Sequence, residues 1–245
     1  IRLDVDDLTI NGNGHAIDAL GKARIFDCTG KNVTIKNVVL KNGFAKMNGG
    51  AICIYYGSLT VRKSSFTANT AKYGGAIYNG SDGELTITES TLKENTARYG
   101  GAIRNYGGEL TLTDSTLTAN TARNGGAIHN SYGELTITGS TLTGNIAQGP
   151  NLTRGGAIYN EGGKIKITES ALNSNTAEML GGAICNWKGG NLIIMESTLN
   201  SNRANIGAAI YSHNHSKIYM YENCTFRDNE LDDVYLNNAR IPQLL

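Results

Sequence analysis

The side chains best suited to binding recur at spacings of 25 to 30 residues along the chain. One series follows each Gly-Gly-Ala-Ile tetrapeptide or its nearest equivalent: Cys53, Tyr78, Arg104, His129, Tyr159, Cys185 and Tyr211. A second series comes shortly after it: Tyr56, Tyr106, Tyr132, Trp187 and His213. Aromatic rings combine apolar area with polar tips, which suits contact with a sugar ring or with a protein surface. The two series therefore indicate a recognition surface.

The period of these residues predicts that they lie along one edge of the molecule. Side chains alternate between the two faces of a strand, so a residue next to an inward isoleucine faces outward. We expect a ligand contact at Tyr78, Arg104, Tyr106, His129, Tyr132, Tyr159, Trp187 and Tyr211. Ordinary strand propensity is the alternative, because tyrosine is favoured on any half-exposed sheet.

Carboxylates recur with the same period. They form two series, Glu84, Glu109 and Glu134, and then Glu89, Asp114, Glu169, Glu196 and Glu222. Carboxylates on adjacent coils could hold Ca²⁺ or act as the paired acids of a glycoside hydrolase. A catalytic site should be local and should break the repeat, whereas these residues follow it. We therefore interpret them as solvated turn residues, and we predict no catalytic residue, no metal ligand and no cofactor.

The tetrapeptide defines the repeat that must position these side chains. It begins at Gly49, Gly74, Gly100, Gly125, Gly155 and Gly181, and a degenerate copy begins at Gly207. Each unit contains three short runs in which apolar and polar residues alternate, separated by glycine and asparagine turns. No stretch carries the apolar stripe of a helix. The pattern predicts an all-β, single-stranded parallel β-helix or solenoid, right-handed, with about nine coils of 25–26 residues and three short strands per coil.

Aligning the coils predicts which columns form the core. Three columns are apolar: Ile77, Ile103, Ile128, Ile158, Ile184 and Ile210; Leu85, Leu110, Leu135, Ile165, Leu192 and Ile218; and Phe66, Leu92, Leu117, Leu142, Leu172, Leu199 and Phe226. Two are asparagine: Asn79, Asn105, Asn130, Asn160 and Asn186; and Asn69, Asn95, Asn120, Asn145, Asn175, Asn202 and Asn229. Stacked amides can bond to one another and to turn backbone, so we interpret both as structural ladders.

Composition limits the classes of function. The 245 residues carry a net charge of +1, which argues against nucleic acid as a partner. No apolar run is long enough to insert into a membrane. We predict one β-helix domain over 1–245, with degenerate coils in 1–48, regular coils in 49–229 and a cap in 230–245. We expect it to be a segment of a longer protein. Among the four cysteines, Cys28 and Cys53 lie on adjacent coils and are a candidate disulfide.

Two sequence features carry a resemblance to known families. Gly-Gly-Ala-Ile paired with Phe-x-x-Asn or Leu-x-x-Asn, as in residues 66–69, 117–120 and 226–229, resembles the repeat of the chlamydial polymorphic outer-membrane proteins. The opening segments 8–15 and 32–37 are similar to adhesin-like surface proteins of methanogenic archaea.

The resemblance implies an extracellular β-helix at a cell surface, with its anchor outside this segment. It implies a non-catalytic role in adhesion or as a stalk, with glycans or proteins of another cell as partners. The alternative is a carbohydrate-active β-helix enzyme, either a polysaccharide lyase or a glycoside hydrolase, that uses surface carboxylates.

Overall fold

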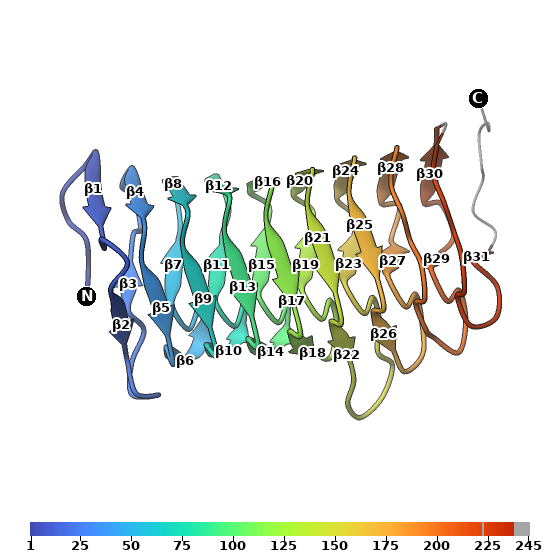
Figure 1. The fold of residues 1–245 in the computed structure, drawn as a ribbon, viewed down its shortest axis with the longest axis horizontal. Coiled ribbons are helices and arrows are strands. Elements are labelled where there is room, and N and C mark those ends of the chain that lie inside the picture. The colour runs from blue at the N-terminus through green and yellow to red at the C-terminus, as the bar shows by residue number, and fades with distance from the viewer. Residues whose placement is uncertain (222, 238–245) are drawn as a thin grey trace.

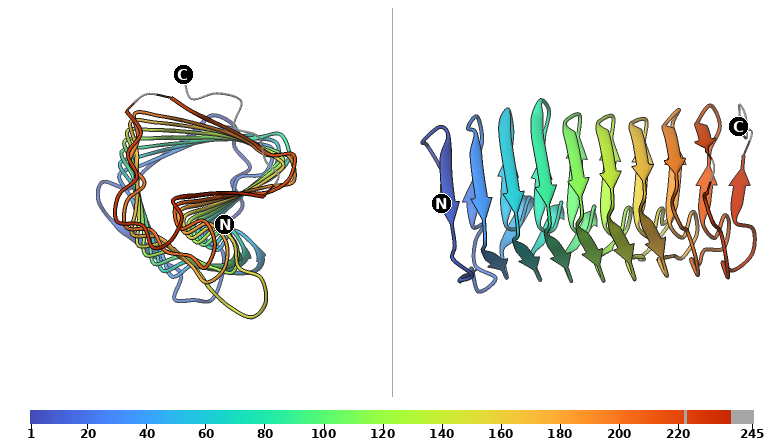
Figure 2. Two further views of the ribbon diagram at one scale, coloured as in Figure 1. Left: turned by 90° about the vertical axis from the view of Figure 1, so that its right-hand side faces the viewer. Right: turned by 45° about the horizontal axis from the view of Figure 1, so that its top comes forward.

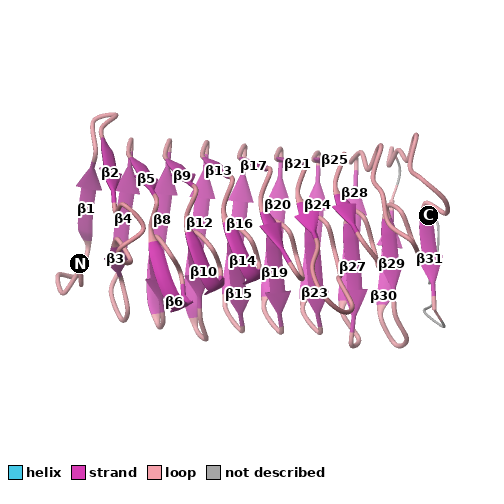
Figure 3. Cartoon of the chain, turned by 90° about the horizontal axis from the view of Figure 1, so that it is seen from below, coloured by secondary structure: helices cyan, strands magenta, loops and turns pink. Residues whose placement is uncertain are grey.

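The computed structural model describes residues 1–221 and 223–237, and it shows a rod built from short strands (Figure 1). The chain winds around the rod axis, so equivalent strands of successive coils lie side by side and pair in parallel. Within the described residues all of the regular structure is strand, and there is no helix that could cross a membrane (Figure 3). The predicted parallel β-solenoid is confirmed.

The strands form four parallel sheets, which we number in the order in which a coil passes through them after its tetrapeptide. Sheet 1 contains β3 (Phe26–Asp27), β7 (Ile52–Ile54), β11 (Ile77–Asn79), β15 (Ile103–Tyr106), β19 (Ile128–Ser131), β23 (Ile158–Glu161), β27 (Ile184–Trp187), β29 (Ile210–Ser212) and β31 (Val234–Leu236). Sheet 2 contains β1 (Leu8–Asn11), β4 (Val33–Lys36), β8 (Gly57–Arg62), β12 (Gly83–Thr88), β16 (Glu109–Thr113), β20 (Glu134–Thr138), β24 (Lys164–Thr168), β28 (Asn191–Met195) and β30 (Lys217–Met220). Sheet 3 contains β2 (Ala16–Asp18), β5 (Val39–Lys41), β9 (Ser65–Thr67), β13 (Thr91–Lys93), β17 (Thr116–Thr118), β21 (Thr141–Thr143) and β25 (Ala171–Asn173). Sheet 4 contains β6 (Phe44–Asn48), β10 (Thr70–Tyr73), β14 (Thr96–Tyr99), β18 (Thr121–Ala122), β22 (Ile146–Ala147) and β26 (Thr176–Ala177).

Sheet 4 differs from the prediction of three strands per coil. From β10 on, its strands follow the second asparagine column directly, and the shortest of them, β18, β22 and β26, contain two residues each. Two residues cannot show an alternating pattern, so the sequence gives no periodic signal for this fourth strand. The coils are therefore four-sided wherever sheet 4 is present.

The interior of the rod is the predicted stack of apolar side chains. Register pairs place Ile77 beside Ile103 and Ile103 beside Ile128, and the other two columns stack in the same way. The predicted core residues are 0–2% exposed, except Phe226, which is half-buried in the last coil. Burying each such side chain contributes roughly 1.5–3 kcal/mol, so these columns supply most of the stabilisation.

Both asparagine columns are confirmed as structural ladders. From Asn79 to Asn186, each Nδ2 donates to the next Oδ1 over 2.8–2.9 Å. In the column from Asn69 to Asn229 the corresponding distances are 2.9–3.2 Å. These side chains are fully buried apart from Asn229, so the amides satisfy corner backbone that water cannot reach.

The Gly-Gly pair makes the sharpest corner of each coil, where sheet 4 meets sheet 1. At Gly101, a Cβ atom would lie 2.8 Å from the carbonyl oxygen of Thr121 and closer still to that of Gly126. Only glycine allows the backbone to approach so closely. Seen along the rod, the outline is indented on the side of this corner (Figure 2).

The C-terminal end of the rod is extended by β31, which pairs with β29. Val234 and Leu236 of this strand pack against the core. The remainder of the predicted cap, residues 238–245, lies outside the described residues.

Candidate functional site

Three columns of side chains lie along the indented side of the rod, and we call this strip the groove. The first column ends sheet 4 directly before each Gly-Gly pair or its equivalent: Asn48, Tyr73, Tyr99, Asn124, Arg154, Leu180 and Ile206. The second, on sheet 1, contains Cys53, Tyr78, Arg104, His129, Tyr159, Cys185 and Tyr211. The third lies two residues further on and includes Tyr106, Ser131, Glu161 and Trp187.

The predicted solvent exposure of the second column was wrong. Strand alternation does turn these side chains away from the core, but all seven are at most 8% exposed. The reason is the Gly-Gly corner, which folds sheet 4 back so that the first column faces the second. Their role in binding stays a prediction, and it now concerns a groove rather than an open edge.

The third column also differs from the predicted edge at two residues. Tyr106 pairs in register with Ser131, so Tyr132 lies one position beyond the column, and the register of Ile54 with Asn79 places Tyr56 one position beyond it as well. Tyr132 has a φ of 57° and occupies the turn to sheet 2, where it is 60% exposed. Tyr106 is 43% exposed and Trp187 is half-buried, so both remain accessible from the groove.

The groove contains a cavity of about 340 Å³ that we call the groove pocket. Its lining is polar and aromatic: Tyr73, Tyr99, Arg104, Arg123, Asn124, His129, Arg154, Tyr159 and Glu161. Three of these, Arg104, His129 and Tyr159, are among the predicted site residues. The other six were not foreseen.

A signal for some of the missed residues was present in the sequence. Most columns repeat one residue type, but the position before Gly-Gly changes from tyrosine to asparagine to arginine to leucine. Stacking favours the same residue type at equivalent positions of successive coils. A column in which the residue type varies is therefore not determined by stacking. That irregularity, rather than the period, marks the groove.

Arg104, His129 and Glu161 form a connected network in the pocket. The Arg104 guanidinium contacts Nδ1 of His129, and Nε2 of His129 lies 3.3 Å from the Glu161 carboxylate. Burial, aided by the neighbouring Arg104, lowers the pKa of His129 to about 3, so its ring is neutral. The contact with His129 and an ion pair of 2.7 Å with Lys188 lower the pKa of Glu161 to about 2.

Aromatic rings flank this network along the groove. The rings of Tyr73 and Tyr99 stack with centroids 5.4 Å apart, and the His129 ring lies 4.6 Å from that of Tyr159. The Arg104 guanidinium lies over the rings of Tyr99 and Tyr106, at 5.7 and 5.6 Å. These contacts fix the direction of the arginine without neutralising its charge.

The C-terminal part of the groove is filled by apolar side chains. Leu180, Cys185 and Tyr211 form a small cluster with Tyr159 there, and Leu152 packs against it together with Trp187. Leu152 belongs to the loop that lengthens one repeat unit to 30 residues. The insertion therefore closes the groove next to the pocket, and Tyr211 lies in the filled part. At the other end, Tyr78 packs against the ring of Tyr55.

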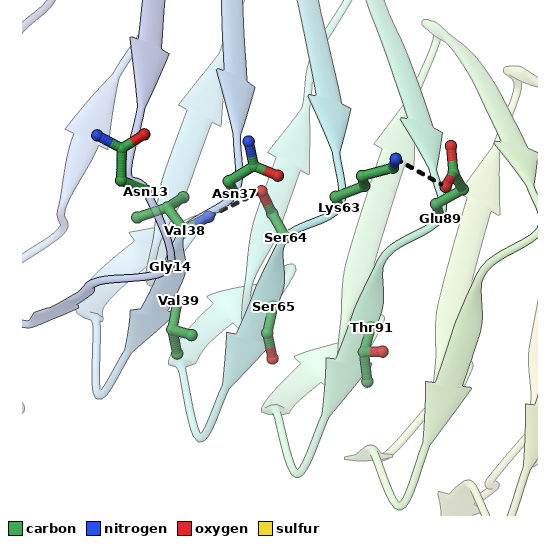
Figure 4. A pocket seen from close by; sticks show the side chains of 10 residues that line it. All are labelled: Asn13, Gly14, Asn37, Val38, Val39, Lys63, Ser64, Ser65, Glu89 and Thr91. Atoms are coloured by element: carbon green, nitrogen blue, oxygen red, sulfur yellow. Dashed lines mark hydrogen bonds and ion pairs between the residues drawn. The ribbon is translucent and has the colours of Figure 1, made fainter.

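A larger depression, of about 700 Å³, lies at the corner between sheets 2 and 3 (Figure 4). Its polar groups serve the coil: the hydroxyl of Ser64 accepts from Val38 N and donates to Arg62 O, and Lys63 pairs with Glu89 at 3.5 Å. The same serine pattern recurs at Ser90 and Ser115. This depression is a feature of the repeat and not a local site.

The acidic columns lie away from the groove pocket. Glu84, Glu109 and Glu134 are exposed and stack in register on sheet 2, where Lys164 continues the column. Glu89, Asp114, Glu169 and Glu196 occupy left-handed corner positions, and Glu222 lies outside the described residues. Over residues 1–221 and 223–237, no three His, Cys, Asp or Glu side chains gather closely enough to hold a metal ion.

The candidate disulfide between Cys28 and Cys53 is not formed, and both thiols are free. Cys28 belongs to the core cluster, whereas Cys53 is on the groove face of its strand. The two side chains therefore point to opposite sides of the coil. Burial raises the pKa of Cys28 to about 12 and that of Cys53 to about 11, so neither is a reactive thiolate.

Comparison with known proteins agrees with this architecture. Neither the curated proteins nor the solved structures contain a match to this chain. The sequence model of the right-handed β-helix region matches residues 2–162, about two thirds of the chain, and the protein therefore belongs to the right-handed β-helix family.

Proposed function

We propose that this chain is a non-catalytic, adhesin-like β-helix that acts at the cell surface and binds a glycan or protein of another cell through the groove. The observation that carries the proposal is the groove pocket. It is the place where the repeat is broken by polar and aromatic side chains of different types. Concave sites with convergent polar groups and aromatic walls are the usual form of a binding site.

The rigidity of the fold supports a binding role. The groove side chains of sheet 1 project from strands whose opposite faces pack in the core and in an asparagine ladder. Such a scaffold holds its contacts in place before a ligand arrives, which reduces the entropy cost of binding. The same rod would also hold a partner away from the surface that bears it.

The lining of the pocket is less suited to glycoside hydrolysis, the alternative that the acidic columns raised. That reaction uses two carboxyl groups about 5–9.5 Å apart across the scissile bond. Glu161 is the single carboxylate among the pocket-lining residues, and Lys188 already pairs with it. We therefore place the role of the groove in recognition.

A glycan-array and whole-cell binding screen tests the proposal. We expect the protein to bind and the Tyr106→Ala/Trp187→Ala variant to lose most of that binding, because both rings are accessible in the groove. The control is Tyr219→Ala/Tyr221→Ala, which removes two tyrosines near the end of sheet 2. Melting temperatures of both variants confirm that they fold.

Two results of the binding screen would overturn the proposal. One is binding that the control loses as fully as the groove variant does, since the contact then lies elsewhere. The other is an absence of binding by the unaltered protein, which would leave a spacer role. Turnover of a polysaccharide that Glu161→Gln abolishes would instead identify the protein as a carbohydrate-active enzyme.

A further inference from the structure

The groove pocket contains more positive charge than its surroundings neutralise. Arg104, Arg123 and Arg154 line it, and within residues 1–221 and 223–237 no carboxylate lies within ion-pair distance of any of them. Glu161 is the one acidic side chain in the lining, and its charge is already balanced by Lys188 at 2.7 Å. His129 is neutral. None of the three guanidinium groups therefore has an ion-pair partner among these residues, and Glu161, which acts on Arg104 at longer range, is shared with Lys188.

Burial makes this imbalance costly. Arg104 is only 8% exposed, and its removal from water lowers the pKa of its guanidinium. A charge that is taken out of water without a partner destabilises the fold unless another group supplies the opposite charge. An anion in the pocket would supply it, and three guanidinium groups around one cavity favour oxyanions, which a guanidinium can bind in a bidentate way.

Three buried polar atoms without a hydrogen-bond partner indicate which further groups the ligand should contain. The Nε atoms of Arg123 and Arg154 are buried without an acceptor, and Oδ1 of Asn124 is buried without a donor. Asn124 is 4% exposed and lines the pocket. A ligand that satisfies all three must therefore accept bonds through an anionic group and also donate one. A sugar acid does both, because it combines an oxyanion with hydroxyl groups.

The arrangement along the rod suggests a chain rather than a single sugar. Arg104 belongs to the coil of Tyr99, Arg123 precedes Asn124 of the next coil, and Arg154 follows on the third. Successive coils are spaced by the ~4.8 Å between neighbouring strands, so the three positive charges follow one another along the axis, although they belong to different columns. The Tyr106 ring is 43% exposed and lies 5.6 Å from the Arg104 guanidinium, so it can pack against a sugar face.

We propose that the groove pocket binds an acidic oligosaccharide, with the carboxylate or sulfate groups of its sugars on Arg104, Arg123 and Arg154. This inference rests on the proposed binding function of the groove and specifies its ligand class. The two oxyanions share the same chemistry at a guanidinium, and the experiment separates them.

Isothermal titration calorimetry tests the inference with three oligosaccharide probes of equal length. They are an oligogalacturonate, its methyl ester, which is neutral, and a sulfated oligosaccharide. We expect the protein to bind at least one acidic probe, more weakly as salt is added, and to bind the ester at least 10-fold less tightly. The tighter of the two acidic probes identifies the oxyanion.

Two variants and a matched control assign the binding to the pocket. Arg123→Gln and Arg154→Gln each remove one charge from a side chain that is partly exposed, so the fold should tolerate them. We expect each to weaken binding about 10-fold or more, since bonds to charged groups are among the strongest. Arg62→Gln removes the same charge from the exposed face of sheet 2 and should leave the affinity unchanged.

Each contrary result has a distinct meaning. Equal affinity for the ester and the acid, or equal losses in the Arg62→Gln control, would overturn the inference. An oligoglutamate peptide that binds as tightly as the saccharides would overturn the saccharide class. If cell binding still depends on Tyr106 and Trp187 in these cases, the proposed function stands alone. If the acidic probe binds but no cell does, the ligand class stands and the surface role fails.

Discussion

The two faces of strand β15 differ in what they repeat from coil to coil. On the inner face, Ile103 and Asn105 have an isoleucine and an asparagine as register neighbours on either side. On the groove face, Arg104 lies between a tyrosine and a histidine. The same backbone therefore carries one uniform face and one variable face.

The difference shows where stacking decides the residue and where it does not. A buried amide bonds best to another amide, and an isoleucine packs best on a neighbour of the same shape, so the inner face becomes uniform. The groove face has no such requirement. Uniform columns thus show how the rod is held together, and the variable columns contain the proposed binding site.

The largest difference in stability is expected between substitutions of a ladder asparagine, Asn120, and a groove asparagine, Asn124. Asn120 accepts bonds from N and Nδ2 of Asn95 and donates to Leu92 O and Asn145 Oδ1, at 2.9–3.0 Å. Asn120→Leu leaves these buried partners unsatisfied, and we expect a loss of roughly 4 kcal/mol or more in the free energy of unfolding. Chemical denaturation measures it.

Asn124→Leu is the matched exchange in the groove. Its Oδ1 is already without a donor, so removing the amide should change the free energy of unfolding by less than about 1 kcal/mol. Equal losses for Asn120→Leu and Asn124→Leu would contradict the division into a structural and a binding face.

The glycine corner that creates the groove should be the next most sensitive position. In Gly101→Ala the new Cβ would overlap the backbone oxygens of Thr121 and Gly126, and we expect a loss of about 3 kcal/mol in the free energy of unfolding. Gly107 has a left-handed φ of 69°, which Gly101 does not have, but a Cβ there would meet nothing closer than 3.5 Å. Gly107→Ala should therefore cost only the roughly 1 kcal/mol of the left-handed conformation, as measured in the same denaturation series.

The sequence was sufficient to predict most of the fold because the fold is repetitive. Seven aligned coils turn a weak strand signal into columns, and each column reports burial through its residue type. The same method could not detect sheet 4, since Thr121–Ala122 is too short to show a period. It also could not show the re-entrant bend at Gly100 and Gly101, which depends on contacts between coils.

That bend explains why the candidate site was only partly predicted. Alternation correctly turned Arg104 and Tyr159 away from the core, but it cannot indicate what lies on the other side. Tyr99 and Arg154 reach these residues from sheet 4, across the corner. Arg123 and Glu161 do not belong to a column of one residue type, so the repeat does not identify them. Their charges suggest a role in binding only because the fold brings both side chains to the same pocket.

Acid should destabilise the groove face before it affects the inner face, which contains no titratable ladder. The pKa of His129 falls from 6.5 in the unfolded chain to about 3 in the fold. The titration of His129 therefore leaves the stability of the fold unchanged above pH 6.5. The stability falls as the pH decreases below that value, because the unfolded chain then binds a proton that the folded protein does not. Between pH 7 and pH 5 we expect a loss of roughly 2 kcal/mol.

His129→Gln should remove most of this pH dependence while keeping a polar side chain beside Arg104. Urea unfolding at the two pH values measures it for both proteins. Glu161 does not interfere, since its pKa lies near 2 and that of the free side chain is 4.5. A variant with the same loss of stability on acidification would show that His129 is not the buried neutral group.

The smallest effect is expected at the ion pair of Lys63 and Glu89, in the corner depression of Figure 4. The Nζ atom lies 3.5 Å from Oε2, and the two side chains are 62% and 44% exposed, so water screens most of their attraction. We expect a double-mutant cycle of Lys63→Ala and Glu89→Ala to give a coupling of about 0.5 kcal/mol or less. Because this depression follows the repeat, the exchanges should also leave binding at the groove unchanged. A coupling well above 1 kcal/mol, or a loss of ligand binding, would mean that a column can follow the repeat and still be part of a functional site.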